Sequence, residues 1–198
     1  MGRKSHYVQA INHKDIDFLN ALRCSGICTK DQATQFISAN RLKNYVLDKT
    51  LEKCSFITKD GRRQEVYRIS GAGEKFIAKN IPQLSNHYYH STGHEHDLKL
   101  MDKILTLPRE ERQTMRCESE IRDEFKERLQ AYLNQGDTER YNQLHEAMFV
   151  THSVSMPDLA YGVDEYYEVI TSSYGEAEIQ AKIEAVAEVG GNLIMDRI

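Results

Sequence analysis

The sequence predicts a mixed fold of the α+β or α/β class, divided into two domains of opposite charge. Apolar residues recur at helical spacing in both halves, and short runs rich in Val, Ile, Tyr and Phe lie between them. A length of 198 residues accommodates one large domain or two small ones. Residues 1–82 carry 15 Lys or Arg and 8 Asp or Glu, whereas residues 83–198 carry 11 and 22. We therefore expect a basic domain at 1–82, a linker at 83–94 and an acidic α/β domain at 95–198.

Three short helices are predicted at the start of the chain. The first covers about residues 13–24, where apolar side chains recur at helical spacing. The second begins at Thr29, whose hydroxyl and the side chain of Gln32 fit a capping box for free backbone amides. The third follows the polar turn at Ser38 and runs to about Lys49. The short loops between these segments predict a compact helical cluster.

A hairpin follows the helices. Residues 53–58 and 64–70 are β-prone, and the Asp60-Gly61 pair between them is a strong signal for a tight hairpin turn. A short closing helix is expected at about 73–79. Three helices, a basic hairpin and a closing helix are typical of a winged helix-turn-helix domain.

Such a domain predicts binding to double-stranded DNA. A helix fits the major groove, where Arg, Lys and Asn reach the base edges, and a hairpin tip places cations beside phosphates. The residues expected to contact bases are Asn40, Arg41, Lys43 and Asn44, and those expected to contact phosphates are Lys59, Arg62 and Arg63. A winged helix that binds another protein is the alternative, because fold does not fix function.

The second half predicts an α/β arrangement. A helix predicted between two strands suggests a βαβ crossover, and therefore some parallel pairing of strands. The expected helices cover about 95–106, a segment with apolar residues from 121 to 129, one that begins at Asp137, and one around 179–186; the expected strands are 115–119, 150–161, 165–171 and 192–195.

Several short motifs add a resemblance. They are HDL at 96–98, ESEIR at 118–122, MPDLAY at 156–161 and YYEVITSSYGEAEIQAKIEA at 166–185. Together with the predicted winged helix, they make the chain resemble the replication-relaxation family of bacterial mobile elements. That resemblance covers nearly the whole chain. It implies a DNA-binding winged helix joined to a domain like the PD-(D/E)XK nucleases, with the restriction-endonuclease-like fold, and a role in plasmid or phage replication, relaxation or transfer.

The nuclease-like pattern is incomplete. Such enzymes hold Mg²⁺ with two strand carboxylates and place a Lys beside the attacking water. Asp158 matches the first carboxylate and Glu168 the second, with Glu118 as an accessory acid. Ile170 stands where the strand Lys would be, so Lys182 on the next helix is the possible substitute. We therefore expect a non-catalytic domain without a cofactor, and keep a Mg²⁺-dependent nuclease as the alternative.

The histidines and cysteines do not form a convincing metal site. His87, His90, His94 and His96 crowd into ten residues, but structural zinc usually has Cys ligands or well-spaced pairs. Cys24 and Cys28 lack a second pair, and all four cysteines, with Cys54 and Cys117, are expected to be reduced thiols. The chain begins without an apolar signal and contains no run of eighteen apolar residues, which favours a cytoplasmic protein.

The combined expectation is a sequence-specific DNA-binding protein of a mobile element. It would act as an accessory factor in replication, relaxation or transfer, or as a transcription regulator. A homodimer is expected, because such proteins usually pair on palindromic sites. The acidic domain would associate with itself or with a replication, relaxase or transcription protein, since phosphates would repel it.

Overall fold

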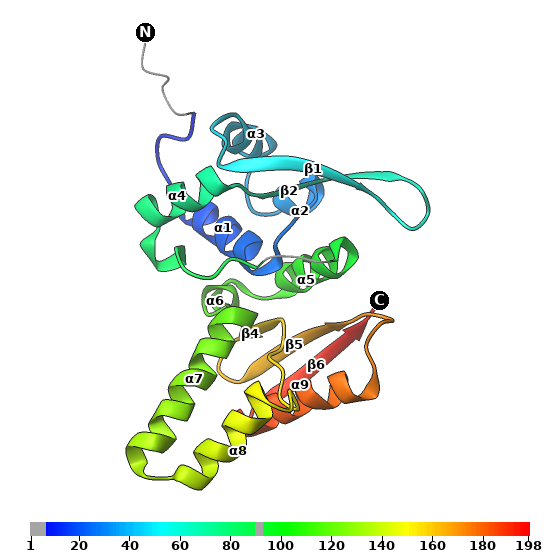
Figure 1. Cartoon of the computed structure of the whole chain (residues 1–198). Coiled ribbons are helices and arrows are strands. Elements are labelled where there is room, and N and C mark those ends of the chain that lie inside the picture. Colours follow the sequence, from blue (N-terminus) through cyan, green and yellow to red (C-terminus); the bar gives the residue numbers. More distant parts are fainter. Residues whose placement is uncertain (1–6, 90–92) are drawn as a thin grey trace. The chain divides into compact units, whose positions relative to one another are not determined.

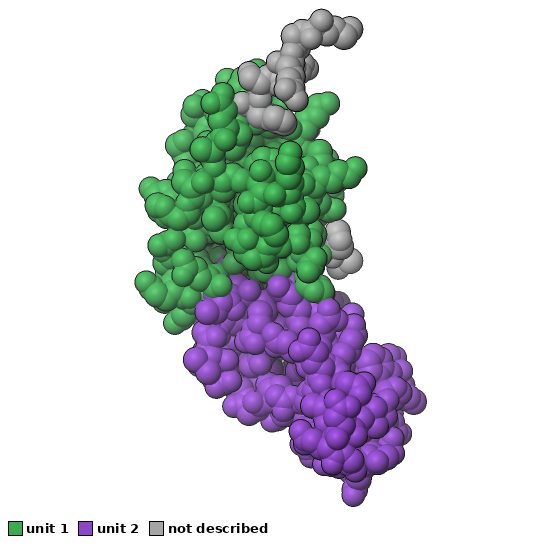
Figure 2. Space-filling model, turned by 90° about the vertical axis from the view of Figure 1, so that its left-hand side faces the viewer, with its two compact units in different colours: residues 1–113 green, residues 114–198 purple. Residues whose placement is uncertain are grey.

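The computed structural model describes residues 7–89 and 93–198, and the chain forms two compact units (Figure 1 and Figure 2). The first covers Met1–Gln113 and the second Thr114–Ile198. Each unit combines helices with a small sheet, so the expected mixed class is confirmed. The segment 83–94, expected as a linker, lies within the first unit.

The first unit begins with three helices, a hairpin and a fourth helix. The helices are α1 (His13–Ser25), α2 (Lys30–Ala33), α3 (Ala39–Leu47) and α4 (Gly71–Asn80), and the strands β1 (Leu51–Ile57) and β2 (Arg63–Ile69) precede α4. A 3₁₀ turn (Pro82–Leu84), α5 (His94–Thr106) and α6 (Arg109–Gln113) complete the unit. The expected order of helices and strands is thus present, and α5 joins this unit because it packs on α1 and α2.

Local chemistry explains where these helices begin. The capping box predicted at α2 is present, since Thr29 N–H donates to Gln32 Oε1 at 2.8 Å and Gln32 N–H to Thr29 Oγ1 at 3.2 Å. Ser38 caps α3 with a single hydrogen bond, in which its hydroxyl accepts from Arg41 N–H. Asn12 and Asp15 form a further capping box at α1. Polar residues in the right positions therefore separate the three helices.

The hairpin is regular and is anchored at its base. β1 and β2 pair antiparallel from Leu51 opposite Ile69 to Ile57 opposite Arg63, and Gly61 in the turn has φ of 79°. Cys28, just before α2, adds an antiparallel bridge to Tyr67, which the sequence did not predict. Figure 1 shows the hairpin projecting beyond the helices of its unit.

The second unit contains a four-stranded sheet covered by helices. Its strands β3 (Arg116–Cys117), β4 (Leu159–Tyr161), β5 (Glu165–Ile170) and β6 (Asn192–Arg197) lie in that order. β5 and β6 are parallel and α9 (Glu176–Val189) connects them, so the predicted βαβ unit is confirmed. The expected strand at 150–161 was too long, because only its last three residues pair.

Helices α7 (Glu118–Gln135), α8 (Thr138–Phe149) and α9 pack on one face of this sheet. Their shared core contains Ile121, Phe125, Leu129, Leu144, Met148, Met156, Ala160, Tyr166, Ala185 and Val186. Asp137 caps α8 as predicted, with its carboxylate accepting from Arg140 N–H at 3.0 Å. Across the described residues, no helix is both long and apolar enough to span a membrane.

Candidate functional site

Helix α3 presents one polar face to solvent and buries the other. Leu42 and Tyr45 are buried at 2% and 0% exposure, and the Tyr45 ring lies 6.5 Å from that of Phe18 in the core. Asn40 and Lys43 are exposed and Asn44 is half-buried. The amphipathic spacing thus leaves three of the four expected base-contacting residues accessible to a ligand.

A basic groove lies between α3 and the hairpin. Its volume is about 580 Å³, and the cations at it are Lys30 from α2, Lys43 from α3 and Lys53 from β1. Glu65 of β2, which pairs with Lys53, supplies its one carboxylate. The other lining residues are Ala39, Asn40, Leu42, Val46 and Tyr67. Sequence reasoning missed Lys30 and Lys53, although the outward position of Lys53 in the alternating strand β1 was a usable signal.

Arg41 is held by the protein itself. Its Nε lies 2.8 Å from Asp15 Oδ1 and its Nη2 2.7 Å from Asp15 Oδ2, and Nη2 also donates to the carbonyl of Ala10. The Asp15 side chain is fully buried, and its hydrogen bonds to Arg41 raise the pKa of the guanidinium. In this structure the pairing with Asp15 links Arg41 of α3 to α1, and the expected base contact of Arg41 stays a prediction.

The hairpin tip carries the three expected phosphate-contacting cations. Lys59 and Arg62 are strongly exposed at 78% and 84%, and each pairs with a carboxylate, Lys59 with Glu95 of α5 and Arg62 with Asp60. The Nε of Arg63 donates to Ser55 Oγ at 3.0 Å. Exposed pairs of this kind contribute little to stability, so the cations can exchange a carboxylate for a phosphate at small cost.

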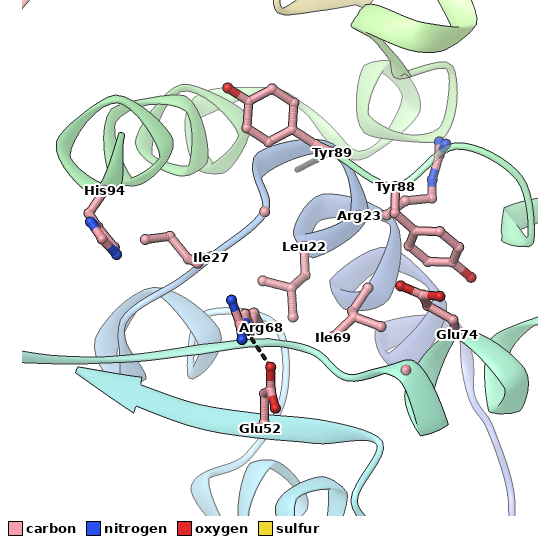
Figure 3. Close-up of a pocket in the computed structure, with 12 residues that line it drawn as sticks. Leu22, Arg23, Ile27, Glu52, Arg68, Ile69, Glu74, Tyr88, Tyr89 and His94 are labelled. Atoms are coloured by element: carbon pink, nitrogen blue, oxygen red, sulfur yellow. Dashed lines mark hydrogen bonds and ion pairs between the residues drawn. The ribbon is translucent and has the colours of Figure 1, made fainter. Parts of the chain in front are cut away.

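A second pocket of the first unit lies at the base of the hairpin and has a volume of about 350 Å³ (Figure 3). Glu52 and Arg68, opposite each other in the hairpin, form an ion pair at its wall. Glu74 lines another part beside Tyr88, and burial followed by the Glu74 charge raises the pKa of that phenol. Both acidic and basic side chains line the pocket, so its charge does not select one class of ligand.

Three of the four predicted nuclease residues meet in the second unit. Asp158 precedes β4, Glu168 lies in β5 and Lys182 in α9, and all three are buried at 4%, 1% and 6% exposure. Lys182 Nζ lies 3.0 Å from Glu168 Oε1 and also donates to the carbonyl of Met156. Tyr174 donates its hydroxyl to Glu168 Oε1 at 2.8 Å.

Backbone amides join the two carboxylates. Asp158 N–H donates to Glu168 Oε2 at 2.9 Å, and Val169 N–H donates to Asp158 Oδ2 at 2.9 Å. Burial, and then the Asp158 charge, raises the pKa of Glu168 to about 7, against the opposing effect of Lys182. Burial followed by the Glu168 charge also raises the pKa of the Tyr174 hydroxyl.

At least three of the four carboxylate oxygens of Asp158 and Glu168 already have partners within the chain. A magnesium site needs carboxylate oxygens open to the ion, to water and to substrate phosphate. Here the Lys182 ammonium and the Tyr174 hydroxyl already lie against Glu168 Oε1, and amides take Glu168 Oε2 and Asp158 Oδ2. Glu118, the expected accessory acid, pairs with Arg122 one turn along α7. Lys182, Glu168 and Tyr174 thus form a buried, hydrogen-bonded cluster that links α9 to the sheet.

The remaining histidines and cysteines have separate surroundings. The His94 ring stacks on Phe56 with centroids 4.2 Å apart, and His96 Nδ1 lies 3.2 Å from Asp97 Oδ1. His90 lies outside the described residues. In residues 7–89 and 93–198 no group of three His, Cys, Asp or Glu side chains is placed to hold a metal ion. The four cysteines are free thiols, and burial raises the pKa of Cys28.

Comparison of the chain with protein-family models, with curated proteins and with solved structures finds no match.

Proposed function

We propose that the first unit is a winged helix-turn-helix domain that binds double-stranded DNA. In this proposal α3 enters the major groove as the recognition helix, and the β1–β2 hairpin is the wing that follows the phosphate backbone. The order of α1, α2, α3, hairpin and α4 supports this assignment, as does the bridge from Cys28 to Tyr67 that gives the hairpin a third strand position.

The observation that carries the proposal is the basic groove between α3 and the hairpin. Lys30, Lys43 and Lys53 reach it from three separate elements, and Asn40 stands on its wall. Cations from several elements in one concave surface match the continuous charge of a phosphate backbone. The first unit as a whole carries 19 Lys or Arg and 13 Asp or Glu, while the second carries 7 and 17. DNA is therefore attracted to the first unit and repelled by the second.

The side chains divide into two roles. Asn40, Lys43 and Asn44 are the base-contacting candidates, since an amide can bind adenine and an ammonium can bind the acceptors of guanine. Lys59, Arg62 and Arg63 contact phosphates, together with Lys30 and Lys53 of the groove. Arg41 is left out of the contact surface, because Asp15 holds its guanidinium.

The resemblance to the replication-relaxation family supplies the biological setting of the proposal. It supports a cytoplasmic protein of a plasmid, phage or integrative element that recognises an origin or an operator. Replication, relaxation, transfer or transcription is then the process that this DNA binding serves.

The experiment is a fluorescence anisotropy titration of specific and random duplexes at two salt concentrations. The specific duplex comes from selection of bound fragments of the element's own DNA. Lys43→Ala should weaken the specific duplex by about 1–3 kcal/mol and the random duplex much less. Arg63→Ala should weaken both alike and reduce the salt slope by about one unit.

Lys79→Ala is the matched control, because it removes the same charge from α4, away from the groove. It should leave both affinities close to those of the unchanged protein. Binding that does not fall with salt, or an equal loss for Lys43→Ala and Lys79→Ala, would overturn the proposal and favour a winged helix that binds protein.

A further inference from the structure

Strand β6 forms one edge of the four-stranded sheet, with β5 as its neighbour. Its hydrogen bonds to β5 use every second residue: Asn192 N–H donates to Asp164 O at 2.8 Å, and Ile198 N–H to Ile170 O at 3.0 Å. In a parallel ladder the residues between these point their N–H and C=O groups the other way. The backbone groups of Leu193, Met195 and Arg197 therefore face the open edge of the sheet.

The first four residues of this edge strand lack the features that usually prevent a strand from pairing with another chain, and its charged residues, Asp196 and Arg197, lie at its end. Edges are commonly blocked by Pro, by inward-pointing Lys, by bulges or by very short strands. β3 at the opposite edge has two residues, whereas β6 has six and contains neither Pro nor Lys. Its central side chains, Leu193, Ile194 and Met195, are apolar and half-buried. The strand is thus long enough and apolar enough to accept a partner strand.

We propose that β6 pairs antiparallel with the β6 strand of a second copy of this chain, about a two-fold axis at Ile194. In that register Ile194 meets Ile194 of the other copy, and Leu193 meets Met195. On the same face as Ile194, Asn192 lies opposite Asp196 of the other copy. Within its own chain the Asn192 amide donates to Glu165 Oε2 at 2.8 Å, and Asp196 Oδ2 accepts from the Tyr167 hydroxyl at 2.8 Å. Apolar side chains then face apolar ones, and the two sheets form one continuous sheet of eight strands.

Ile179 and Ile183 of α9 form an apolar patch on the side of that helix nearest the open edge of β6. Ala177, Ala181 and Glu184 face α8, since they line a cleft with residues of that helix. Ile179 and Ile183 stand about 160° from Ala181 around the helix, at 100° for each residue. Because α7 contacts β3 and β4 whereas α9 contacts β6, this side of α9 looks past β6 toward the open edge. Ile183 is 39% exposed there, and the same residue of a second copy would cover it.

The surface is independent of the DNA-binding proposal, since it lies wholly in the second unit. The proposal specifies which strand forms the symmetric dimer and which residues of the two copies lie opposite each other.

The first test measures the mass of the full chain by light scattering and by sedimentation at increasing micromolar concentrations. The unchanged chain should be a dimer that dissociates on dilution. Ile194→Lys sets two ammonium groups opposite each other at the axis and should weaken the dimer at least tenfold. Val163→Lys places the same charge in the exposed β4–β5 turn, where Val163 is 84% exposed, and should remain dimeric. A monomeric unchanged chain, or equal behaviour of the two variants, would overturn the proposal.

The second test examines the register and does not require a destabilising change. In a Cys54→Ser background, Ile194→Cys and Met195→Cys are each oxidised and run on a non-reducing gel. Because the outward backbone bonds belong to the odd residues, Ile194 occupies a non-hydrogen-bonded pair with Cα atoms about 4.5 Å apart, which a disulfide can bridge. The two Met195 Cα atoms would be on the order of 8 Å apart, which is too far.

Ile194→Cys should therefore form a cross-linked dimer and Met195→Cys should not. The native thiols of Cys24, Cys28 and Cys117 are buried, so the background chain itself should not form a cross-linked dimer. Absence of the Ile194→Cys cross-link in a chain with unchanged circular dichroism contradicts this pairing, as does equal cross-linking of the two variants.

Discussion

Replacing Glu168 with Gln should remove a specific part of the pH dependence of stability. Burial and the Asp158 charge raise the pKa of Glu168 from 4.5 to about 7 in the folded chain, while the unfolded chain keeps the ordinary value. Between these two pH values the folded chain holds a proton that the unfolded chain has released. The free energy of unfolding must therefore fall as pH rises through this window.

The magnitude follows from the size of the shift. A shift of one pKa unit is worth about 1.4 kcal/mol, so the full contribution is about 3 kcal/mol, of which about 2 kcal/mol falls between pH 5 and pH 7.5. It is fully present below the unfolded pKa and is lost as pH rises through the folded pKa. The side chain is 1% exposed, so solvent screening is small.

Urea unfolding followed by circular dichroism at several pH values measures this effect. The unchanged chain should lose about 2 kcal/mol more than Glu168→Gln between pH 5 and pH 7.5, because glutamine cannot ionise. Glu127→Gln, at an exposed position on α7, is the matched control and should follow the unchanged chain. If the difference between the unchanged chain and Glu168→Gln is independent of pH, or grows in the opposite direction, the buried cluster does not hold Glu168 as described.

Three further results are expected. Arg41→Ala should lower the free energy of unfolding by roughly 3 kcal/mol in urea titrations, because it leaves the buried Asp15 carboxylate without its guanidinium; a loss confined to DNA affinity would contradict this role. Gly73→Ala should cost about 1–3 kcal/mol in thermal unfolding, since a Cβ there would lie 2.0 Å from the backbone oxygen of Thr50; an unchanged melting temperature would show that α4 can shift. Supercoiled DNA incubated with Mg²⁺ or Mn²⁺ should stay intact, and cleavage that Asp158→Ala abolishes would show that the cluster opens to a metal ion.

The sequence predicted the local features well, because neighbouring residues determine them. The capping box of Thr29 and Gln32 and the N-cap at Asp137 are formed by residues within three positions of each other. The hairpin turn at Gly61 follows from a single Asp-Gly pair. Helices and strands bounded by such signals can be placed from the chain alone.

Contacts between distant residues could not be predicted in the same way. The ion pair between Arg41 and Asp15 is an example, because Asp15 lies 26 positions away and no residue near Arg41 indicates it. Residues 150–158 show no hydrophobic periodicity that distinguishes a strand from a loop. The predicted strand at 150–161 was therefore longer than β4. Lys182 could be predicted near Glu168 only as the substitute for the missing strand Lys. No sequence pattern indicated that Tyr174 would contact Glu168.

DNA binding and dimer formation are proposed for different residues, so each proposal can be refuted separately. A chain with Ile194→Lys keeps the groove of Lys30, Lys43 and Lys53. As a monomer it should therefore still bind a single half-site, with the salt dependence expected of one DNA-binding domain. Lys43→Ala keeps β6 unchanged and should still form the dimer. If the pair recognises a palindrome, Ile194→Lys should bind the full site far more weakly than the unchanged chain, because it loses the second linked contact. A full-site affinity that does not depend on β6 would separate the dimer from DNA recognition and leave each to be judged by its own test.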